Sequence, residues 1–298
     1  MNTPIPYLGE SLALLTAFIW ASAVILFKKS GESVHPIALN LFKTVMATVL
    51  IIPTMWLFGE TFFRPVSTSD YILLLLSGVI GIGLSDTMFF KSLNLLGAGL
   101  SAIVDCLYSP FIIGLSVLWI GERLNGWQVL GVVMIVAAVL TATSKEKQNR
   151  ISSRNLIWGI IWGVAAMASM AVGIVMIKPM LEHSPVLWAT EVRLIGGGIT
   201  LILILLFYPS RRAVINSLLN SHNWKYTISG SFLGAYLAMI VWLAGMKFAQ
   251  ASIASALNQT SNVLVFIFAA ILLKEPVNTR KIIGIGLGVG GAFLVTFG

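Results

Sequence analysis

The stretch SKEKQNRISSR, residues 144–154, is the most polar segment of the chain and lies at its middle. The sequence on both sides is strongly apolar: of 298 residues, 57% are hydrophobic and only 10% are charged. Soluble domains carry roughly 25% charged residues, so this chain has too few to cover a surface that faces water. We therefore predict an integral membrane protein in which residues 145–154 link two membrane-embedded halves, residues 1–144 and 155–298.

Apolar segments of the length needed to cross a bilayer recur along both halves. A spanning helix requires roughly 20 mostly apolar residues. The sequence predicts ten such spans, near 8–27, 36–57, 71–92, 97–120, 126–143, 155–177, 185–208, 224–246, 251–273 and 280–297. The predicted fold class is all-α, with five transmembrane helices in each half.

The two halves also align with each other. The aligned pairs are Gly9 and Gly159, Ala21 and Ala171, Lys28 and Lys178, and Lys43 and Arg193 at a shift of 150 residues, and Gly81 and Gly234, Ala98 and Ala251, Glu122 and Glu275, Asn125 and Asn278, and Gly131 and Gly284 at a shift of 153. Because five is an odd number, the second half must enter the membrane upside down relative to the first. Such inverted repeats are typical of secondary transporters, whose substrate site lies between the repeats near mid-membrane.

Four segments carry a resemblance to a known family: FIWASAVILFKK (18–29), GLSDTMFFKSLNLLGA (83–98), YSPF with the later GERL (108–124), and LLKEPVNTRKIIGIGLGVGGAFLV (272–295). They resemble EamA-type transporters of the drug/metabolite transporter superfamily over nearly the whole chain. The resemblance implies a ten-helix bundle in which the fifth and tenth helices brace the outside and the other eight line a central cavity. It also implies a secondary transporter of small metabolites in the bacterial inner membrane.

The distribution of basic residues and the resemblance predict opposite orientations. Lysines and arginines are more frequent in the loops after spans 1, 3, 5, 7 and 9 than on the other side. The positive-inside rule then places the linker in the cytoplasm and both termini outside. The resemblance implies cytoplasmic termini. The N-terminal MNTPIPYLGE lacks the basic region and cleavage site of a signal peptide.

Motifs of catalysis and cofactor binding are missing from the sequence. There is one cysteine, and the three histidines have no partner at metal-ligand spacing. GLGVGG (286–291) matches a dinucleotide-binding pattern, but it lies inside a span with no strand before it. The net charge of +8 comes from basic residues at span ends, where helices meet headgroups. We expect no enzyme activity, metal, cofactor or nucleic acid.

Charged residues inside the predicted spans are the main candidates for function, because such residues are costly in a bilayer. Those well inside the spans, away from the helix ends, are the acids Asp86, Asp105 and Glu191 and the bases Lys43 and Arg193, whereas Lys91 lies nearer a turn. Asp86 and Asp105 each lie about 14 Å from the turn near Leu96, by helix rise, so they share a depth. The first half can thus assemble a neutral cluster of Lys43, Lys91, Asp86 and Asp105. Glu191 and Arg193 are two residues apart and point to different faces of one helix, so at least one needs a partner elsewhere.

Asp105 aligns with the uncharged Asn258 in the other half. A lock between helices would keep the same chemistry in both copies, whereas an acid opposite an amide suits an asymmetric ligand. Three roles remain open for these acids: a counter-charge for a ligand amine, a proton-coupling group (Asp86, Asp105 or Glu191), or an ion pair that only joins helices. Lys43 and Arg193 are likewise open between cavity residues and helix-joining ion pairs.

Other polar and aromatic residues complete the predicted substrate cavity: Trp20, Tyr108, Tyr236, Trp242, Asn258 and Gln259. Their polar groups favour a wet cavity over lipid, although aromatics are also ordinary packing residues. Glu122 and Glu275, at equivalent turns, are expected to be structural. The pairs Gly159 with Gly163 and Gly284 with Gly288 are expected to be close-packing surfaces between helices.

The sequence therefore predicts a secondary transporter that exports amino acids or related amphipathic compounds, acting as a monomer or homodimer. Its expected partners are a small-molecule substrate, the lipid bilayer and, in a coupled mechanism, protons. The first alternative is proton-coupled efflux of cationic drugs, which the acids would suit. The second is a membrane scaffold or receptor without transport, which the lack of a sizeable extramembrane domain disfavours.

Overall fold

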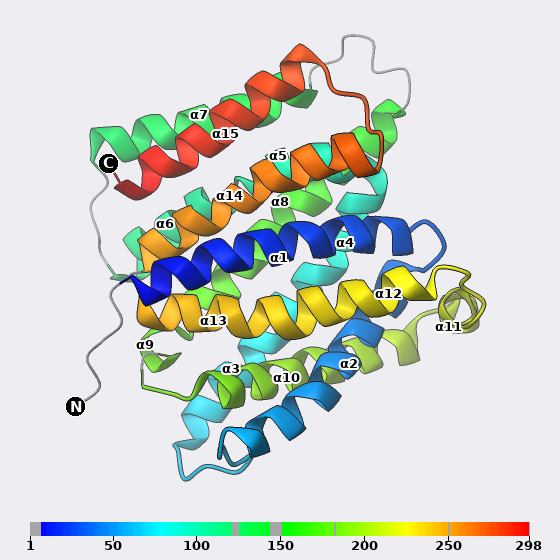
Figure 1. Cartoon of the computed structure of the whole chain (residues 1–298), viewed down its shortest axis with the longest axis vertical. Coiled ribbons are helices and arrows are strands. Elements are labelled where there is room, and N and C mark those ends of the chain that lie inside the picture. Colours follow the sequence, from blue (N-terminus) through cyan, green and yellow to red (C-terminus); the bar gives the residue numbers. More distant parts are fainter. Residues whose placement is uncertain (1–6, 121–124, 144–150, 182, 250, 298) are drawn as a thin grey trace.

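The computed structural model describes residues 7–120, 125–143, 151–181, 183–249 and 251–297, and the regular structure within these ranges is helical (Figure 1). The elements are α1 (Leu8–Ser30), α2 (Pro36–Leu57), α3 (Thr68–Gly78), η1 (Val79–Leu84), α4 (Ser85–Leu96), α5 (Ala98–Asp105), α6 (Tyr108–Ile120), α7 (Gly126–Thr143), α8 (Ser153–Val175), α9 (Lys178–Leu181), α10 (Val186–Phe207), α11 (Arg211–Leu219), α12 (Trp224–Ser231), η2 (Phe232–Leu237), α13 (Ala238–Phe248), α14 (Ala251–Leu272) and α15 (Thr279–Phe297).

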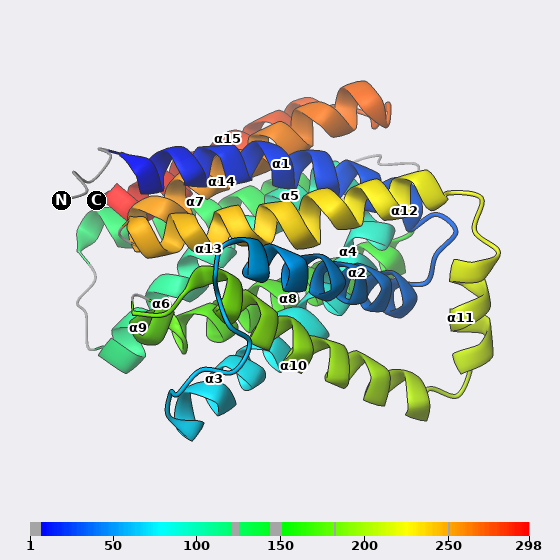
Figure 2. The ribbon, with the colours of Figure 1, turned by 60° about the horizontal axis from the view of Figure 1, so that its bottom comes forward.

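Each of the ten predicted spans coincides with helical structure. Seven described segments are long and apolar enough to cross a membrane: Leu8–Ser30, Pro36–Leu57, Thr68–Leu96, Ala98–Leu115, Ser153–Val175, Val186–Phe207 and Trp224–Phe248. Two shorter apolar helices cover Gly126–Ala142 and Leu257–Leu272. The short helices α9 and α11 were not predicted. Helix α11 lies at the end of the bundle opposite the start of α1 and the end of α15 (Figures 1 and 2).

The packing of the helices repeats between the two halves. Helix α1 packs against α13 and α14. Its counterpart in the second half, α8, packs against α4, the counterpart of α13, and against α5 and α6, which together correspond to α14. The two remaining pairs join counterparts directly, α2 with α10 and α7 with α15. Figure 1 shows α7 and α15 side by side at one edge of the bundle, which confirms the expected bracing position of the fifth and tenth helices.

Glycines allow these helices to approach closely. A methyl group on Gly159 would lie 2.6 Å from Leu96, and one on Gly163 would lie 2.6 Å from Val104, so α8 packs directly on α4 and α5. Gly288 of α15 would meet Cys106 Sγ at 2.8 Å in the same way. The predicted glycine surfaces are therefore confirmed as contacts between helices.

Two predicted spans contain a π-helical segment at equivalent positions. η1 (Val79–Leu84) interrupts the third span, and η2 (Phe232–Leu237) interrupts the eighth, at an offset of 153 residues. Hydrogen bonds in a π-helix run from residue i to i+5, so the segment shifts the faces of the helix on either side of it, and such segments occur often at functional sites. The sequence analysis expected uninterrupted α-helices at both places.

The fourth span is broken at Cys106 and Leu107. Helix α5 ends at Asp105, where Cys106 N donates to Ile103 O and Leu107 N donates to Val104 O in a tight turn, and α6 begins at Tyr108. Pro110 has no N–H with which to continue the helical hydrogen bonds across this turn. The counterpart helix α14 runs unbroken from Ala251 to Leu272, so the interruption belongs to the first half alone.

Polar side chains form hydrogen bonds with backbone groups at the ends of several helices. The Glu275 carboxylate accepts from Ala98 N at 2.8 Å and from Gly99 N at 2.9 Å, which satisfies the free N–H groups at the start of α5. Its predicted structural role is thereby confirmed, whereas Glu122 lies outside the described residues. The aligned lysines act alike: Lys28 Nζ donates to Asn94 O at the end of α4, and Lys178 Nζ donates to Met246 O near the end of α13.

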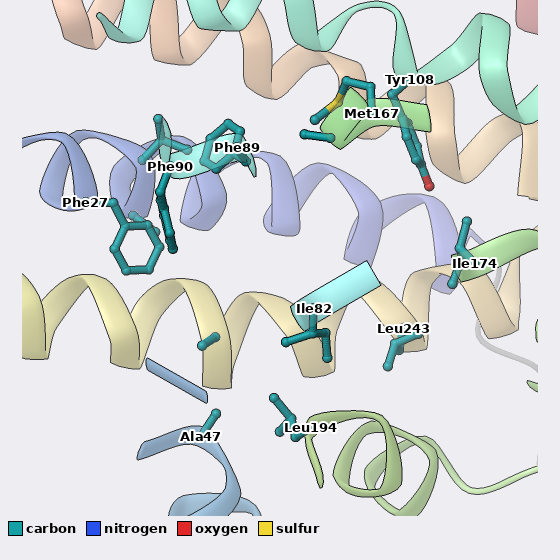
Figure 3. Close-up of a cluster of buried hydrophobic side chains, with 14 of the residues drawn as sticks. Phe27, Ala47, Ile82, Phe89, Phe90, Tyr108, Met167, Ile174, Leu194 and Leu243 are labelled. Atoms are coloured by element: carbon teal, nitrogen blue, oxygen red, sulfur yellow. The ribbon is translucent and has the colours of Figure 1, made fainter. Parts of the chain in front are cut away.

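The core joins side chains from both halves. Figure 3 shows Phe27 and Phe90 of the first half in one cluster with Leu194 and Leu243 of the second. The rings of Phe27 and Phe90 meet edge to face, with centroids 5.0 Å apart. One continuous core therefore spans the interface between the two halves.

Candidate functional site

A cavity of about 120 Å³ lies between the two halves. Its lining residues come from α1, α2, η1, α4, α5 and α6 of the first half and from α8, α10, η2, α13 and α14 of the second: Thr16, Trp20, Lys43, Gly81, Ile82, Asp86, Phe89, Asp105, Tyr108, Met167, Met170, Arg193, Gly234, Ala238, Met239, Trp242, Asn258, Gln259, Ser261 and Asn262. The set includes every residue that the sequence analysis assigned to the substrate cavity except Tyr236.

Lys43 and Asp86 form an ion pair in the cavity wall. Lys43 Nζ lies 2.6 Å from Asp86 Oδ2, and the two side chains are 3% and 6% exposed. Lys91 does not join them, contrary to the predicted cluster of four charges. Its ammonium group lies over the Trp162 ring, 4.5 Å from the centroid, because this position near the end of α4 faces α8. The charges of Lys43 and Asp86 thus cancel locally.

Asp105 occupies the break between α5 and α6. It is partly exposed to the cavity, and among the described residues no side chain donates a hydrogen bond or forms an ion pair with its carboxylate. The next helix begins three residues later, so the positive end of the α6 dipole lies close by. A carboxylate held at a helix break without a protein partner is available to a cationic group of a ligand.

Arg193 of α10 supplies the opposite charge. Its side chain is 1% exposed, Nε donates to Ser77 Oγ at 2.9 Å, and the guanidinium lies 5.7 Å from the Trp242 ring centroid. The terminal nitrogens Nη1 and Nη2 have no hydrogen-bond partner among the described residues. A fixed guanidinium with two free donors matches the bidentate geometry of a carboxylate.

Close helix crossing holds Arg193 in place. A methyl group on Gly78 would overlap Arg193 O, and one on Gly196 would overlap Leu75 O, so α3 and α10 can cross this closely only because both positions are glycine. At the same crossing, a methyl group on Gly81 would lie 3.3 Å from Arg193 Nη2. The glycines therefore leave space at the guanidinium that larger residues would fill.

Amide and hydroxyl groups line the wall near Asp105. Gln259 donates to Ser109 Oγ at 2.8 Å, and Asn262 donates to the Gln259 side-chain oxygen. By contrast, Tyr108 Oη and Asn258 Oδ1 are buried without a hydrogen-bond partner among the described residues. Paired amides give this wall its shape, and the two unpaired oxygens are left for a ligand or water.

Two candidates lie outside the cavity lining. Tyr236, predicted to face the cavity, shares a 2.7 Å hydrogen bond with Thr54 Oγ1 of α2 instead. It lies within η2, where the wider helical turn changes which face each residue presents. Glu191 is completely buried on α10, and neither of its carboxyl oxygens has a hydrogen-bond partner among the described residues. As predicted from their spacing, Glu191 and Arg193 point to different surroundings.

The sequence analysis missed several lining residues. The most informative are Gly81 of η1 and Gly234 of η2, which align at the shift of 153 residues and face the same cavity. Their alignment was visible in the sequence and could have identified them. The apolar members, such as Phe89, Met167 and Met170, had no distinguishing signal, because such residues are frequent throughout the spans.

Comparisons with known proteins agree with this architecture. The sequence matches the EamA-like transporter family over residues 7–144 and again over 157–297. It is 22% identical over 274 residues to an uncharacterized transporter of Archaeoglobus fulgidus, covering 92% of each chain. It is also 22% identical over 286 residues to the uncharacterized transporter YetK of Bacillus subtilis, covering 95% of this chain and 85% of YetK. One solved crystal structure superimposes with a TM-score of 0.70 at 19% identity, over 97% of this chain and 96% of that chain, which shows a shared fold.

Proposed function

The chain belongs to the EamA-like transporter family, and from this membership we propose that it is a secondary active exporter of amino acids or related amphipathic compounds. The protein is an integral membrane transporter and not an enzyme. It is further proposed to act in a bacterial inner membrane and to move its substrate out of the cell.

The observation that supports this substrate class is the presence of two unpaired opposite charges in one cavity. Asp105 presents a carboxylate, and Arg193 presents the free donors Nη1 and Nη2. A zwitterion with an ammonium group and a carboxylate satisfies both, because each ligand charge meets a protein charge that lacks its own partner. An uncharged ligand would leave both protein charges uncompensated at high cost.

The rest of the cavity suits the apolar part of such a compound. Trp20, Phe89 and Trp242 offer aromatic surface, and Met167 and Met170 add flexible apolar side chains that adapt to different shapes. The Lys43–Asp86 pair adds no net charge. Asn258, across the pseudo-two-fold axis from Asp105, is neutral, so the ammonium group has one preferred position.

The two halves, residues 1–144 and 155–298, are proposed to be the units that move against each other. The cavity draws its walls from both, so relative rotation of the halves would open it to either side of the membrane. The segments η1 and η2 contribute Gly81 and Gly234 to these walls at equivalent positions. Their irregular hydrogen bonding suits them to absorb the change in helix geometry.

The proposal is tested by ligand binding and flux. Purified protein is screened by thermal shift against L-amino acids, their amides and their decarboxylated amines, since a ligand that binds the folded state raises the melting temperature. Amino acids should stabilise the wild type, the amides and amines less so, and Asp105→Asn should lose the response while folding normally. Reconstituted vesicles should then show flux of the stabilising amino acids. Stabilisation by the amines alone would reject the zwitterion.

That last outcome would favour the second candidate, a proton-coupled exporter of cationic drugs. The unpaired Asp105 carboxylate is the observation that favours it. The two candidates differ at Arg193, which binds a carboxylate in the first and repels the ligand in the second. Arg193→Gln should therefore weaken binding of amino acids and strengthen binding of simple cations. A complete lack of flux for both classes would support the scaffold or receptor alternative.

A further inference from the structure

Helix α10 carries a second buried ionisable side chain, Glu191, that the substrate cavity does not use. Its exposed fraction is 0%, and both carboxyl oxygens lack a hydrogen-bond partner among the described residues. It lies five residues into the helix, about 7.5 Å from the start of α10 by helix rise. An ionised carboxylate there would be both desolvated and unpaired, which strongly favours the neutral acid.

The surface of α2 opposite Glu191 is largely apolar, and its one hydroxyl, Thr44 Oγ1, has no hydrogen-bond partner among the described residues. Gly198 lies seven residues further along α10 and therefore on the same face, and a methyl group there would touch Thr44 Cγ2 of α2 at 3.7 Å. The face of Glu191 is thus the one that packs on α2. Beyond Thr44, the same stripe of α2 continues with the completely or almost completely buried side chains of Ala47, Ile51 and Met55.

Within the part of the chain that the structure describes, no charged group near α10 pairs with Glu191. The elements packed on α10 are α2, α3, η1, α11 and α13, and η1 has no titratable side chain. Four of these elements carry titratable or charged side chains: Lys43, Asp70, Tyr71, Arg211, Arg212 and Lys247. Arg193 lies on α10 itself, and Glu60 and Arg64 precede α3, with the Arg64 guanidinium 6.0 Å from the Trp188 ring centroid. Most have other partners: Lys43 binds Asp86, Lys247 binds Ser184 O, and Glu60 accepts from Trp188 N. None forms an ion pair or hydrogen bond with Glu191 among the described residues.

We propose that Glu191 is the proton-binding site that couples transport to the proton gradient, separate from the substrate cavity. In the present conformation it is the neutral acid. Helices α2 and α10 belong to different halves, so their contact changes when the halves move. Water then reaches Glu191, the O–H bond breaks, and the proton passes to water. The hydrated carboxylate later takes up a new proton, and the contact between α2 and α10 closes again. This inference rests on the transport activity proposed above.

The first test reads the protonation state directly and needs no substrate. Infrared spectra of the full-length protein in membranes at pH 7 should show a carboxylic-acid C=O band that disappears in Glu191→Gln. The matched control is Glu60→Gln, since Glu60 lies near the start of α10 and its carboxylate already accepts a hydrogen bond from Trp188 N. The band should remain in this control. An unchanged band in Glu191→Gln would overturn the proposal.

The second test reads coupling in reconstituted vesicles, with radiolabelled L-amino acids as probes. An imposed pH difference should drive accumulation by the wild type, up to about tenfold for each pH unit at one proton per substrate. Glu191→Gln should still carry the probes down their own gradient but should lose this accumulation. Accumulation at the wild-type level in Glu191→Gln would overturn the proposal.

Protein stability and the transport of the probes by the wild type serve as two controls for these tests. Glu191→Gln should melt no lower than the wild type, because an amide replaces a neutral acid in an apolar contact. If it fails to fold, Glu191→Leu provides the same readouts with an apolar side chain of similar size. If the wild type carries none of the probes, the proposed substrate class fails, while the infrared band still decides the state of Glu191 independently.

Discussion

Lys43 of α2 and Asp86 of α4 are joined by a contact of 2.6 Å between Nζ and Oδ2, almost completely shielded from solvent. One turn earlier on α2, Asn40 donates to Thr87 Oγ1 beside Asp86 at 2.9 Å. Two adjacent polar contacts therefore clamp the same pair of helices at the wall of the cavity. The pair provides both local charge neutrality and a fixed helix arrangement in the first half.

Removing one member of this pair should destabilise the protein strongly. Lys43→Met or Asp86→Asn leaves a buried polar or charged group without its partner, and breaking such pairs costs about 3–5 kcal/mol. Thermal unfolding of purified protein measures the effect. The double variant Lys43→Met with Asp86→Leu should recover most of the loss, because no unpaired charge remains. Equal melting of Lys43→Met and the wild type would contradict this role.

Arg193 should determine the affinity for the ligand carboxylate. Arg193→Lys keeps the charge but loses the planar pair of donors and the hydrogen bond to Ser77 Oγ. A charge-assisted hydrogen bond contributes about 1.5–3 kcal/mol, so we expect a 10- to 100-fold weaker affinity in binding assays. Ser77→Ala, which leaves the guanidinium intact, should have a smaller effect. A fully active Arg193→Lys would exclude bidentate recognition.

Gly81 should be needed for access to the same guanidinium. In Gly81→Ala the new methyl group would lie 3.3 Å from Arg193 Nη2 and crowd the side on which a carboxylate binds. We expect a higher KM for the substrate with near-normal protein yield. Gly198→Ala is the matched control, because its methyl group would meet Thr44 at an ordinary 3.7 Å. An equal effect of both substitutions on KM would refute the local explanation.

Glu275 should stabilise the start of α5 across the repeat. Glu275→Ala removes acceptors at 2.8 Å and 2.9 Å from the N–H groups of Ala98 and Gly99. Loss of a helix cap costs about 0.5–2 kcal/mol, which thermal unfolding can resolve. Glu275→Gln retains one acceptor oxygen and should lie between Glu275→Ala and the wild type. A melting temperature unchanged by Glu275→Ala would show that water replaces the cap.

His35 should make stability depend on pH below neutrality. It precedes α2, its Nδ1 accepts from Ile37 N at 3.3 Å, and its ring lies 5.6 Å from that of Tyr208. Burial, together with the positive charge of Lys91, lowers the pKa of His35 from its ordinary value. The unfolded chain therefore binds a proton more readily than the folded protein, so stability is lost as pH falls through about 6.5.

The measurement is the melting temperature of purified protein between pH 7.5 and pH 5. His35→Asn keeps a capping acceptor and should flatten the profile, whereas the exposed His222→Asn should leave it unchanged. A wild-type slope retained in His35→Asn would assign the effect to other groups.

Much of the cavity could be predicted because intramembrane charges are rare and costly. Lys43, Asp86, Asp105 and Arg193 stood out against an apolar background, and the structure brings all four to one cavity. Their pairing could not be predicted. The sequence analysis placed Lys91 in the cluster from its depth alone, but its side chain lies over Trp162 on another face of the helix. The depth of a residue in the membrane follows from counting residues along the helix, whereas the direction of its side chain depends on how the helix is rotated about its axis.

Tyr236 illustrates the same limit in the second half. Its position within a span was predicted, but η2 surrounds it and turns its hydroxyl toward Thr54. A π-segment has no clear signature in an apolar sequence, since it arises from packing against neighbours. The interruption of the fourth span after Asp105 was not predicted either, although Pro110 in the sequence favours a break there.

The class of the protein, the ten helical spans, the duplication around residues 145–154 and the asymmetry between Asp105 and Asn258 could all be predicted from the sequence. These features follow from composition, length and alignment, which need no knowledge of contacts. The fold was needed to find that Lys43 binds Asp86 and that Arg193 lines the cavity with Nη1 and Nη2 unpaired among the described residues. It was also needed to find that Glu191 lies outside the cavity lining. The physical reason is that close packing at glycines and the two π-segments set the rotation of each helix, and rotation selects which buried charges meet.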